Sequence, residues 1–204
     1  MAAMPLDGWQ PDLISVWLFR SVGWCGAFLF TALITALSLS RKHSRDLAFH
    51  DHLTKLPNRR LLEDRISQVM SYSVRYQTSF GIFNLDLDKF KYINDKFGHK
   101  VGDGLLVVVA KRLLASVRAT DTVARVGGDE FIILVNDIHN EFDMEKIRQK
   151  IEKNLISATY VNGIDLDLNV SMGFAVYPED TDSIEKLHSI ADERMYATKK
   201  TKGR

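Results

Sequence analysis

Two groups of carboxylates, each beside an apolar run, are the residues of this chain best suited to chemistry. Asp129 and Glu130 follow Gly127 and Gly128 in the stretch VARVGGDEFIILV, which begins at Val123. Two β-branched, apolar runs around a Gly-Gly centre predict a β-hairpin whose turn carries both acids. Glycine lets another molecule approach the backbone closely, so the turn can present its negative charge to a cation. An ordinary acidic hairpin without a ligand is the alternative interpretation.

The second group, Asp86 and Asp88, ends the segment 79–88. Apolar residues alternate with polar ones from Phe83 onward, which predicts a β-strand with both acids on one face. Acids at a strand end are solvated termini in most proteins. Here they accompany a second acidic site at the hairpin turn, so we expect the two sites to act together.

Acidic sites on neighbouring strands, Asp86 on one and Asp129 with Glu130 on the other, can hold one or two hard cations. Magnesium prefers carboxylate and carbonyl oxygens and completes its shell with water and substrate phosphates. Lys91 and the C-terminal lysines can neutralise phosphate charge. These residues predict metal-assisted phosphoryl or nucleotidyl transfer. The chain has no GxxxxGK[ST] motif, which excludes a P-loop enzyme, and His99 has no His or Cys partner at zinc-site spacing.

The elements that must position these acids follow from hydrophobic periodicity. We expect helices over 59–76, 89–97, 103–116, 140–157 and 183–200. We expect strands at 79–88, in the hairpin 123–135, and at 166–177, which an Asn162-Gly163 turn joins to a short strand before it. Val74 and Phe142 are assigned to buried helix faces, residues 98–102 to a turn, and Asp103 to a helix N-cap. Strands in hairpins rather than in repeated βαβ units predict an α+β fold, a mostly antiparallel sheet flanked by helices.

Length and composition set bounds on the rest. The chain has 204 residues, of which 46% are hydrophobic, and this suits one domain plus an appendage. A net charge of +1 argues neither for nor against a nucleic-acid partner. Cys25 is the single cysteine, which excludes an intramolecular disulfide and a cysteine-based zinc site.

The N-terminal segment predicts a membrane anchor. Residues 21–40 carry no charge, and the apolar character extends back to Leu13 with only Arg20 interrupting it. Twenty helical residues span about 30 Å, the thickness of a bilayer core. Basic residues follow at 41–45, so the C-terminal side is predicted to face the cytoplasm. We expect a short tail at 1–12, one transmembrane helix at 13–40, a basic juxtamembrane linker at 41–50 and a domain at 51–204. A cleaved signal peptide and a buried core helix are the alternatives.

Several ordered motifs recur along residues 51–204. They are DHLTKLPNRR at 51–60, DLDKFK at 86–91, INDKFGH at 93–99, GD at 102–103, GGDEF at 127–131 and ADERMY at 191–196. In this order and spacing they resemble the GGDEF family, the diguanylate cyclases of bacteria. The family's fold is a palm-like sheet with flanking helices, which agrees with the order of elements predicted above.

The resemblance implies that two GTP molecules, one on each of two facing domains of a homodimer, are joined into cyclic di-GMP with release of pyrophosphate. It implies that Asp86, the Leu87 carbonyl and Asp129 bind Mg²⁺, for which Mn²⁺ can substitute. Asp129 or Glu130 would help to deprotonate the attacking 3′-hydroxyl. Lys91 would stabilise charge on the phosphates.

The resemblance also assigns substrate contacts. Asn94 and Asp103 would recognise guanine, since a carboxylate can accept from N1–H and the exocyclic amine, a donor pair that adenine lacks. His99 lies in the same loop, where a structural role in the turn is the alternative. The family's late lysine aligns with Lys199 or Lys200, and either residue can be the phosphate contact.

Arg118-Ala-Thr-Asp121 looks like the family's RxxD site, where product binds and holds the domain inactive. A salt bridge within the loop is the alternative interpretation of Arg118 and Asp121. Family members commonly continue beyond the position of Arg204 into a final strand, so we expect a sheet trimmed at that edge.

The predicted function is therefore a diguanylate cyclase anchored by a single pass in the bacterial inner membrane, with its catalytic domain in the cytoplasm. The expected partners are GTP, cyclic di-GMP, a second copy of the chain and a membrane partner protein, with no nucleic acid. A non-catalytic receptor for GTP or cyclic di-GMP that signals through a partner is the alternative, and a membrane scaffold is a third interpretation. The complete acidic constellation favours the enzyme.

Overall fold

The computed structural model describes residues 33–35, 48–139, 141–156 and 159–202. The chain divides into two compact units, Met1–Asp46 and Leu47–Arg204. Most of the predicted membrane helix at 13–40, together with Cys25, lies outside the described residues. Among the residues that are described, no helix is long and apolar enough to cross a membrane. The membrane anchor and the division at 12, 40 and 50 stay predictions.

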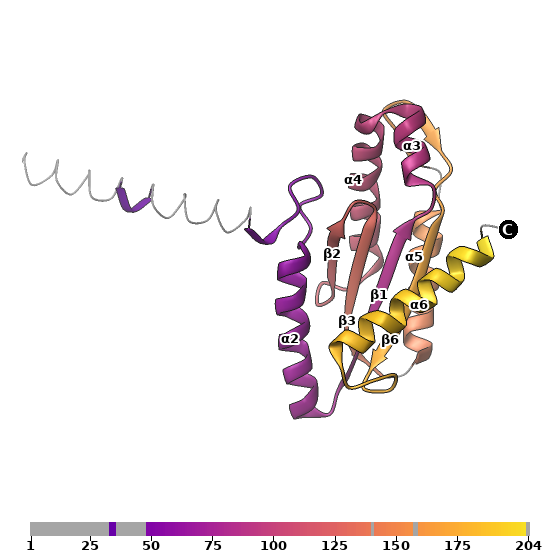
Figure 1. Ribbon diagram of the computed structural model, residues 1–204. Helices are drawn as coiled ribbons and strands as arrows, with labels where there is room; N and C mark the ends of the chain where they lie inside the picture. Colours follow the sequence, from indigo (N-terminus) through magenta and orange to yellow (C-terminus); the bar gives the residue numbers. More distant parts are fainter. Residues whose placement is uncertain (1–32, 36–47, 140, 157–158, 203–204) are drawn as a thin grey trace, which may run out of the picture. The chain divides into compact units, whose positions relative to one another are not determined.

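The second unit is built on a four-stranded antiparallel sheet with the order β2-β3-β1-β6 (Figure 1). Its strands are β1 (Ser79–Leu87), β2 (Thr122–Gly127), β3 (Glu130–Ile138) and β6 (Val170–Tyr177). Strand β1 lies in the middle, between β3 and β6, and every strand pairing is antiparallel. The predicted α+β class, the strand at 79–88 and the hairpin at 123–135 are confirmed.

The prediction of one strand over 166–177 was wrong, because β5 (Ile164–Leu166) belongs to a separate hairpin with β4 (Thr159–Val161). The Asn162-Gly163 turn that joins them is confirmed, with φ of 50° and 84° at its two residues. Strand β6 begins only at Val170, which pairs with Leu87, the last residue of β1. One more hydrogen bond, from the Asp88 N–H to the Asn169 carbonyl at 2.9 Å, extends this pairing, and residues 167–169 belong to no strand.

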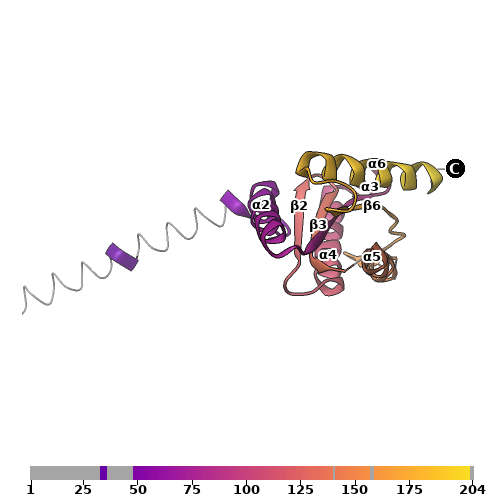
Figure 2. The same ribbon diagram turned by 90° about the horizontal axis from the view of Figure 1, so that it is seen from below.

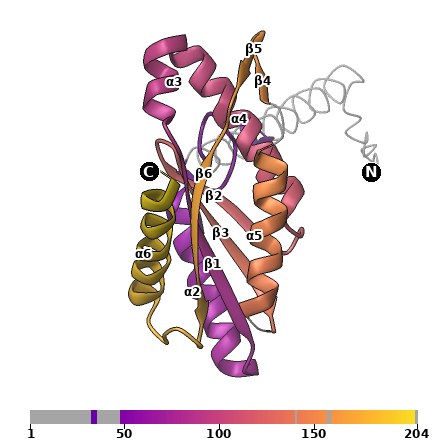
Figure 3. The same ribbon diagram turned by 90° about the vertical axis from the view of Figure 1, so that its right-hand side faces the viewer.

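Helices cover both faces of the sheet (Figures 2 and 3). Helices α2 (Arg59–Tyr76) and α6 (Ile184–Lys202) pack on one face, and α4 (His99–Ser116) and α5 (Glu141–Leu155) on the other. Helix α3 (Phe90–Phe97) follows β1 at one end of the sheet. Alternate residues of β1 feed the two cores: Phe80 and Ile82 pack toward α2 and α6, and Phe83, Leu85 and Leu87 pack toward α4 and α5.

Helix α2 begins and ends where its sequence predicts. The Asn58 side chain accepts a hydrogen bond from the Leu61 N–H, 3.2 Å away, and the helix ends before Gln77, which is left-handed with φ of 52°. Val74 is 63% exposed, so its assignment to the buried face was wrong. The buried stripe continues through Ser73 instead, one position earlier on the helix.

Helix α4 begins directly after Gly98, whose φ is 85°, so the predicted turn over 98–102 was wrong. A single glycine in a conformation that other residues avoid is enough to separate α3 from α4. Asp103 therefore lies inside α4 and is exposed, and it is not the N-cap predicted from the sequence. The capping role that would have explained this acid is absent.

Helix α5 confirms the prediction over 140–157, but Phe142 is 63% exposed and its assignment to the core was wrong. Met144 is fully buried in its place. A β-carbon at Gly81 of β1 would lie only 2.6 Å from the Met144 sulfur. The side chain of Met144 thus fills the space that the glycine leaves open.

Candidate active site

The turn between β2 and β3 is held from one side by Arg125. Its Nε and Nη2 atoms donate to the Gly128 carbonyl at 3.0 and 2.8 Å, and its Nη1 donates to Asp51 Oδ1 at 3.0 Å. Gly128 has φ of 45°, which favours glycine there. Asp129 follows directly, so the position of its carboxylate depends on this anchored turn.

Asp51 is itself fixed by its own loop. The backbone N–H and the hydroxyl of Thr54 donate to Asp51 Oδ1 at 2.8 and 2.6 Å. Burial alone would raise the pKa of Asp51, but the hydrogen bonds from Thr54 and Arg125 outweigh it and hold that pKa below its usual value. The Arg125 and Asp51 side chains are 12% and 15% exposed, so this ion pair is largely shielded from water.

The antiparallel register of β1 and β3 brings the predicted acids together. Asp86 lies opposite Glu130, and the Leu87 N–H approaches the Asp129 carbonyl at 3.4 Å. Asp88 lies just beyond β1, where its carboxylate accepts from the Ser171 hydroxyl at 2.7 Å. The two acidic sites that were predicted to act together thus lie on the adjacent strands β1 and β3, at the same end of the sheet.

Burial and nearby charges set the pKa of Asp129. Burial, and to a smaller extent the negative charge of Asp86, raises the pKa of Asp129, although a hydrogen bond from its own backbone N–H and the charges of Lys199 and Arg125 oppose the shift. Lys199 of α6 places its Nζ 2.6 Å from Asp86 Oδ1. The hydrogen bond to Asp86 in turn raises the pKa of Lys199. Burial of Asp129 therefore outweighs the groups that stabilise its charged form.

The donor set fits a hard divalent cation. Carboxylate and carbonyl oxygens from Asp86, Asp129 and Leu87 are ligands that magnesium and manganese accept, with water and phosphate completing the shell. A cation between the two carboxylates would relieve the repulsion that raises the pKa of Asp129. Across the described part of the chain, no preformed cluster of three His, Cys, Asp or Glu residues that could hold a metal is present. Water and substrate oxygens would complete the shell of a metal held by Asp86 and Asp129.

Asn94 and Asp103, the predicted guanine contacts, come together where α3 meets α4. The Gly98 N–H donates to the Asn94 carbonyl at 2.8 Å. The Asn94 side chain lies against Gly102, where a β-carbon would overlap its amide oxygen. Gly102 directly precedes Asp103, so two of the predicted substrate residues are neighbours in space.

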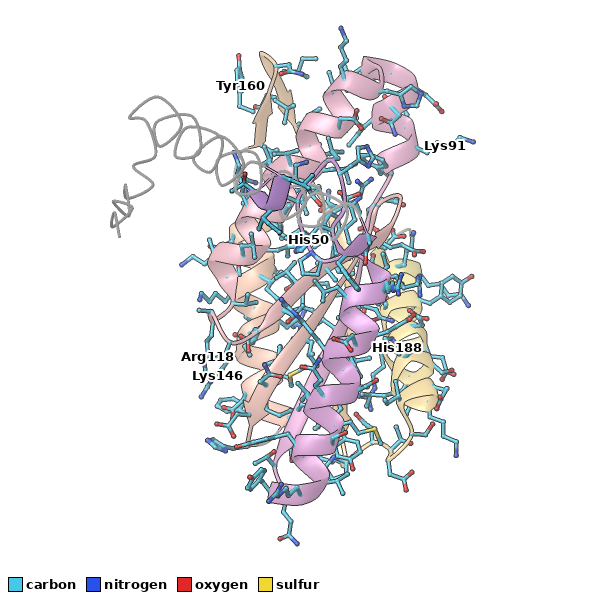
Figure 4. All side chains as sticks on the ribbon, turned by 90° about the vertical axis from the view of Figure 1, so that its left-hand side faces the viewer. His50, Lys91, Arg118, Lys146, Tyr160 and His188 are labelled. Atoms are coloured by element: carbon cyan, nitrogen blue, oxygen red, sulfur yellow. The ribbon has the colours of Figure 1, made fainter. Side chains whose placement is uncertain are left out.

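Lys91 and His99 are exposed on α3 and at the start of α4. Lys91 points away from the body of the domain (Figure 4). The structure therefore places Lys91 at the edge of the site rather than on the paired acids.

A cavity of about 750 Å³ runs along α3. Its charged lining consists of three lysines and three acids, Lys89, Lys96, Lys199, Asp88, Asp165 and Asp167. Lys89 is left-handed, with φ of 59°, and no side chain caps the helix. The first N–H groups of a helix have no partner within it, so α3 presents donors to an anion here. The alternative lysine, Lys200, places its ammonium 4.5 Å from the centre of the Tyr196 ring. Of the two candidate lysines, Lys199 is the one that reaches the acids.

The loop Arg118–Asp121 is organised by backbone contacts. Asp121 accepts from the Arg118 N–H at 2.8 Å and from the Asn136 N–H at 3.2 Å. These bonds involve the Arg118 backbone, not the guanidinium that the salt-bridge alternative requires. The Arg118 side chain lies at the surface of the domain (Figure 4) and lines a cavity of about 600 Å³ together with Tyr72 of α2.

The profile of one family, described as "Diguanylate cyclase, GGDEF domain", matches residues 48–204. The chain belongs to the GGDEF family. The bifunctional diguanylate cyclase/cyclic di-GMP phosphodiesterase MucR of Pseudomonas aeruginosa is 39% identical over 169 residues, which are 83% of this chain and 24% of MucR. Diguanylate cyclase DosC of Escherichia coli is 38% identical over 172 residues, which cover 82% of this chain and 37% of DosC. This chain thus spans about a quarter to a third of the length of these relatives.

Solved structures share this GGDEF fold. The coiled coil and GGDEF domain of DgcB from Caulobacter crescentus, in complex with c-di-GMP, superposes with a TM-score of 0.77 at 25% identity, covering 87% of this chain and 94% of that one. The GGDEF domain of TpbB from Pseudomonas aeruginosa gives a TM-score of 0.72 at 35% identity, covering 74% and 89%.

Two side-chain contacts within this GGDEF domain were not predicted from the sequence. The first is the ion pair of Arg125 with Asp51, although a lone charged residue inside an apolar strand could have indicated it. Asn84 is 5% exposed, and its amide donates to Asp192 of α6. No local pattern links these two residues, because their contact forms only when α6 packs on the sheet.

Proposed function

We propose that this chain is a diguanylate cyclase, which joins two GTP molecules into cyclic di-GMP and releases two pyrophosphates. The observation that carries the proposal is the register of β1 and β3, which sets Asp86 opposite Glu130 and Leu87 against Asp129. Family membership supports the same activity, and relatives named as diguanylate cyclases cover most of this chain.

The nucleotide binds with its phosphates at the start of α3. The unpaired N–H groups of the first turn and the Lys199 ammonium supply positive charge to the triphosphate. Asn94 and Asp103 contact the guanine at the other end of α3, where Asp103 accepts from N1–H and the exocyclic amine. Because Asp103 caps no helix, its carboxylate is available for this contact.

The chemical step is an in-line displacement at the α-phosphorus. The 3′-oxygen of one GTP forms a bond to the α-phosphorus of the other, and the bond from that phosphorus to the pyrophosphate oxygen breaks. Asp129 or Glu130 takes the 3′-hydroxyl proton as the general base. A Mg²⁺ or Mn²⁺ ion bound to Asp86, Asp129 and the Leu87 carbonyl would polarise the phosphate oxygens.

Two copies of the domain are required for the complete product. One site holds one nucleotide, and each of the two phosphodiester bonds joins a 3′-oxygen on one nucleotide to phosphorus on the other. A two-fold dimer with facing sites provides both attacks with the same residues. The active species is therefore a homodimer.

The proposal is tested by product formation from GTP and Mg²⁺ by the full chain and by Asp129→Ala. We expect cyclic di-GMP from the wild type and a loss of about 10²-fold or more in the variant, the scale for removal of a group that acts on the transition state. Asp64→Ala, an exposed acid on α2, is the matched control and should retain full activity. Wild-type protein that binds GTP but makes no product would instead support the receptor alternative.

We propose further that the Arg118 loop binds the product and inhibits the enzyme. The cavity lined by Arg118 and Tyr72 offers a cation for phosphate and an aromatic ring for a base. Arg118→Ala should keep the initial rate and raise the inhibitory concentration of cyclic di-GMP by about tenfold or more, the scale for one charge-assisted contact. Unchanged inhibition in a time course with added product would refute this site.

We also propose that residues 13–40 anchor the chain in the bacterial inner membrane by a single pass, with the catalytic domain in the cytoplasm and a membrane partner protein as a source of input. The uncharged segment 21–40 and the basic cluster at 41–45 support this arrangement. Deletion of residues 1–40 should move the protein from the membrane fraction to the supernatant. An unchanged distribution would contradict the anchor.

A further inference from the structure

Lys199 forms an ion pair with Asp86, a carboxylate that the proposed metal would need as a ligand. Its Nζ lies 2.6 Å from Asp86 Oδ1, and the Asp86 side chain is 13% exposed. A lysine ammonium and a divalent cation cannot both neutralise this carboxylate at full strength, because the two positive charges would repel at close range. The nucleotide-free site therefore already contains a counter-ion of its own.

We propose that Lys199 is an exchangeable counter-ion that holds Asp86 while the site has no nucleotide and moves to the triphosphate when nucleotide arrives. The metal and the nucleotide then bind with positive coupling, because each is favoured by the state in which Lys199 has left Asp86. This inference rests on the proposed function, since it takes the ligands to be a nucleoside triphosphate and a divalent cation.

The position of Lys199 allows this exchange. Its side chain is 44% exposed, and its residue lies in the last turn of α6, which ends at Lys202. The same side chain lines the cavity beside Asp88 and Lys89 at the start of α3. A flexible four-carbon stem can carry the ammonium between two partners at little cost, and partly exposed ion pairs are weak enough to be displaced.

The surrounding charges favour a different partner for Lys199 in the free site and in the nucleotide-bound site. The negative charges of Asp86, Asp88 and Asp129 all act on Lys199 in the free site. A triphosphate brings several negative charges to the α3 end of the cavity, so the ammonium gains a stronger partner there. Asp86 is then left without its counter-ion beside Asp129, and this pair of carboxylates attracts a divalent cation more strongly.

The adjacent lysine provides a matched control. Lys200 has the same chemistry and nearly the same position in the chain, but its ammonium lies over the Tyr196 ring, 4.5 Å from the centre. A general effect of lost positive charge should appear in variants of both lysines. An effect of the Asp86 contact should appear only at Lys199.

The test measures Mn²⁺ binding to the full chain without nucleotide, by the loss of the free-ion electron paramagnetic resonance signal. We expect Lys199→Met to bind Mn²⁺ about fivefold more tightly than the wild type, the upper range for a partly exposed ion pair. Lys200→Met should change the affinity less than twofold. Lys199→Arg, which can keep the ion pair, should remain close to the wild type.

The second measurement determines the coupling between metal binding and nucleotide binding. Titration of a non-hydrolysable GTP analogue at several Mn²⁺ concentrations gives the factor by which metal strengthens nucleotide binding, and linkage makes this factor reciprocal. We expect it to fall about fivefold in Lys199→Met and to stay unchanged in Lys200→Met. The readout is binding, so it does not depend on turnover.

Equal Mn²⁺ affinities in the wild type and Lys199→Met would overturn the inference, and so would equal gains in the two methionine variants. Absence of Mn²⁺ binding in all variants would overturn it together with the metal site. Lys199-dependent coupling in a chain that makes no cyclic di-GMP would support the exchange and contradict the proposed enzyme. The two proposals therefore fail on different results.

Discussion

The ion pair between Asp51 and Arg125 should be worth far more to this domain than its surface salt bridges, and a double-mutant cycle can measure the difference. The two side chains are 15% and 12% exposed and approach to 3.0 Å. The same guanidinium holds the Gly128 carbonyl that precedes Asp129. The cycle therefore tests whether the acidic turn is held by a loop far away in the sequence.

The magnitude follows from burial and from the number of bonds lost. Removal of one partner from a buried ion pair typically costs 3–5 kcal/mol, and slight exposure favours the lower end, so Arg125→Met should lower the free energy of unfolding by about 3 kcal/mol. Asp51→Asn keeps an oxygen that can accept from Thr54 and Arg125, so we expect a loss of about 1.5 kcal/mol. The coupling energy of the pair should be about 1–2 kcal/mol.

The assay is urea denaturation followed by far-ultraviolet circular dichroism. All three tryptophans, Trp9, Trp17 and Trp24, lie before residue 25, so tryptophan fluorescence would not report on the unfolding of residues 47–204. The control cycle uses Glu145 and Arg148 of α5, whose side chains are 34% and 29% exposed. That pair should give a coupling below about 1 kcal/mol.

The pH dependence supplies an independent check. The pKa of Asp51 is lowered in the folded state, so its stabilisation is fully present above the unfolded value near 3.9 and is lost as the pH falls through the lower folded value. The stability gap between wild type and Asp51→Asn should therefore begin to narrow below about pH 4 and continue to narrow as the pH falls further. A coupling no larger than that of the α5 control, or a gap that does not narrow as the pH falls below about 4, would refute the reasoning.

Three further predictions concern the sheet and the site. Gly173→Ala should destabilise the domain by about 3 kcal/mol in the same urea assay, because an added β-carbon would meet the backbone of α6, whereas Gly127→Ala has nothing within 4 Å and should change the unfolding little. Asp129→Asn should raise the melting temperature at pH 7 by about 1–2 °C while activity is lost, since burial raises the pKa of this acid and its charge opposes folding above that pKa. The gain should vanish near pH 4, and a lower melting temperature at pH 7 would contradict it. Asn94→Ala and Asp103→Ala should each lower GTP affinity about tenfold and leave ATP affinity unchanged by calorimetry, and an equal loss for both nucleotides would refute guanine recognition.

Local patterns predicted most of the fold because short-range physics decides those elements. The alternation around Asp86 and the turn at Gly127 and Gly128 gave β1 and the β2–β3 hairpin correctly. The N-cap at Asn58 gave the start of α2. These features depend on neighbours in the chain, so the sequence alone carries the information.

The wrong predictions concern features whose structure depends on residues far away in the sequence. Phe142 rather than Met144 looked like the core residue of α5, because the opening at Gly81 on β1 is invisible to helical periodicity. The strand predicted from 166 begins only at Val170, because its partner β1 ends at Leu87. The contact between Lys199 and Asp86 joins residues 113 positions apart, so the sequence left Lys199 and Lys200 equivalent.

Gly173 connects these long-range features to the site. It pairs with Asn84 in the register of β6 and β1, and the absent side chain lets the backbone of α6 pack directly on the sheet. Asp192 can then accept from Asn84, and Lys199, two helical turns further along, reaches Asp86, which lies on the same face of β1. One glycine thus sets the distance at which α6 delivers the counter-ion to the proposed metal site. Helix α6 is consequently part of the proposed active site. A substitution at Gly173 that leaves the domain folded should still weaken the coupling between Mn²⁺ and nucleotide binding in the titration of the GTP analogue.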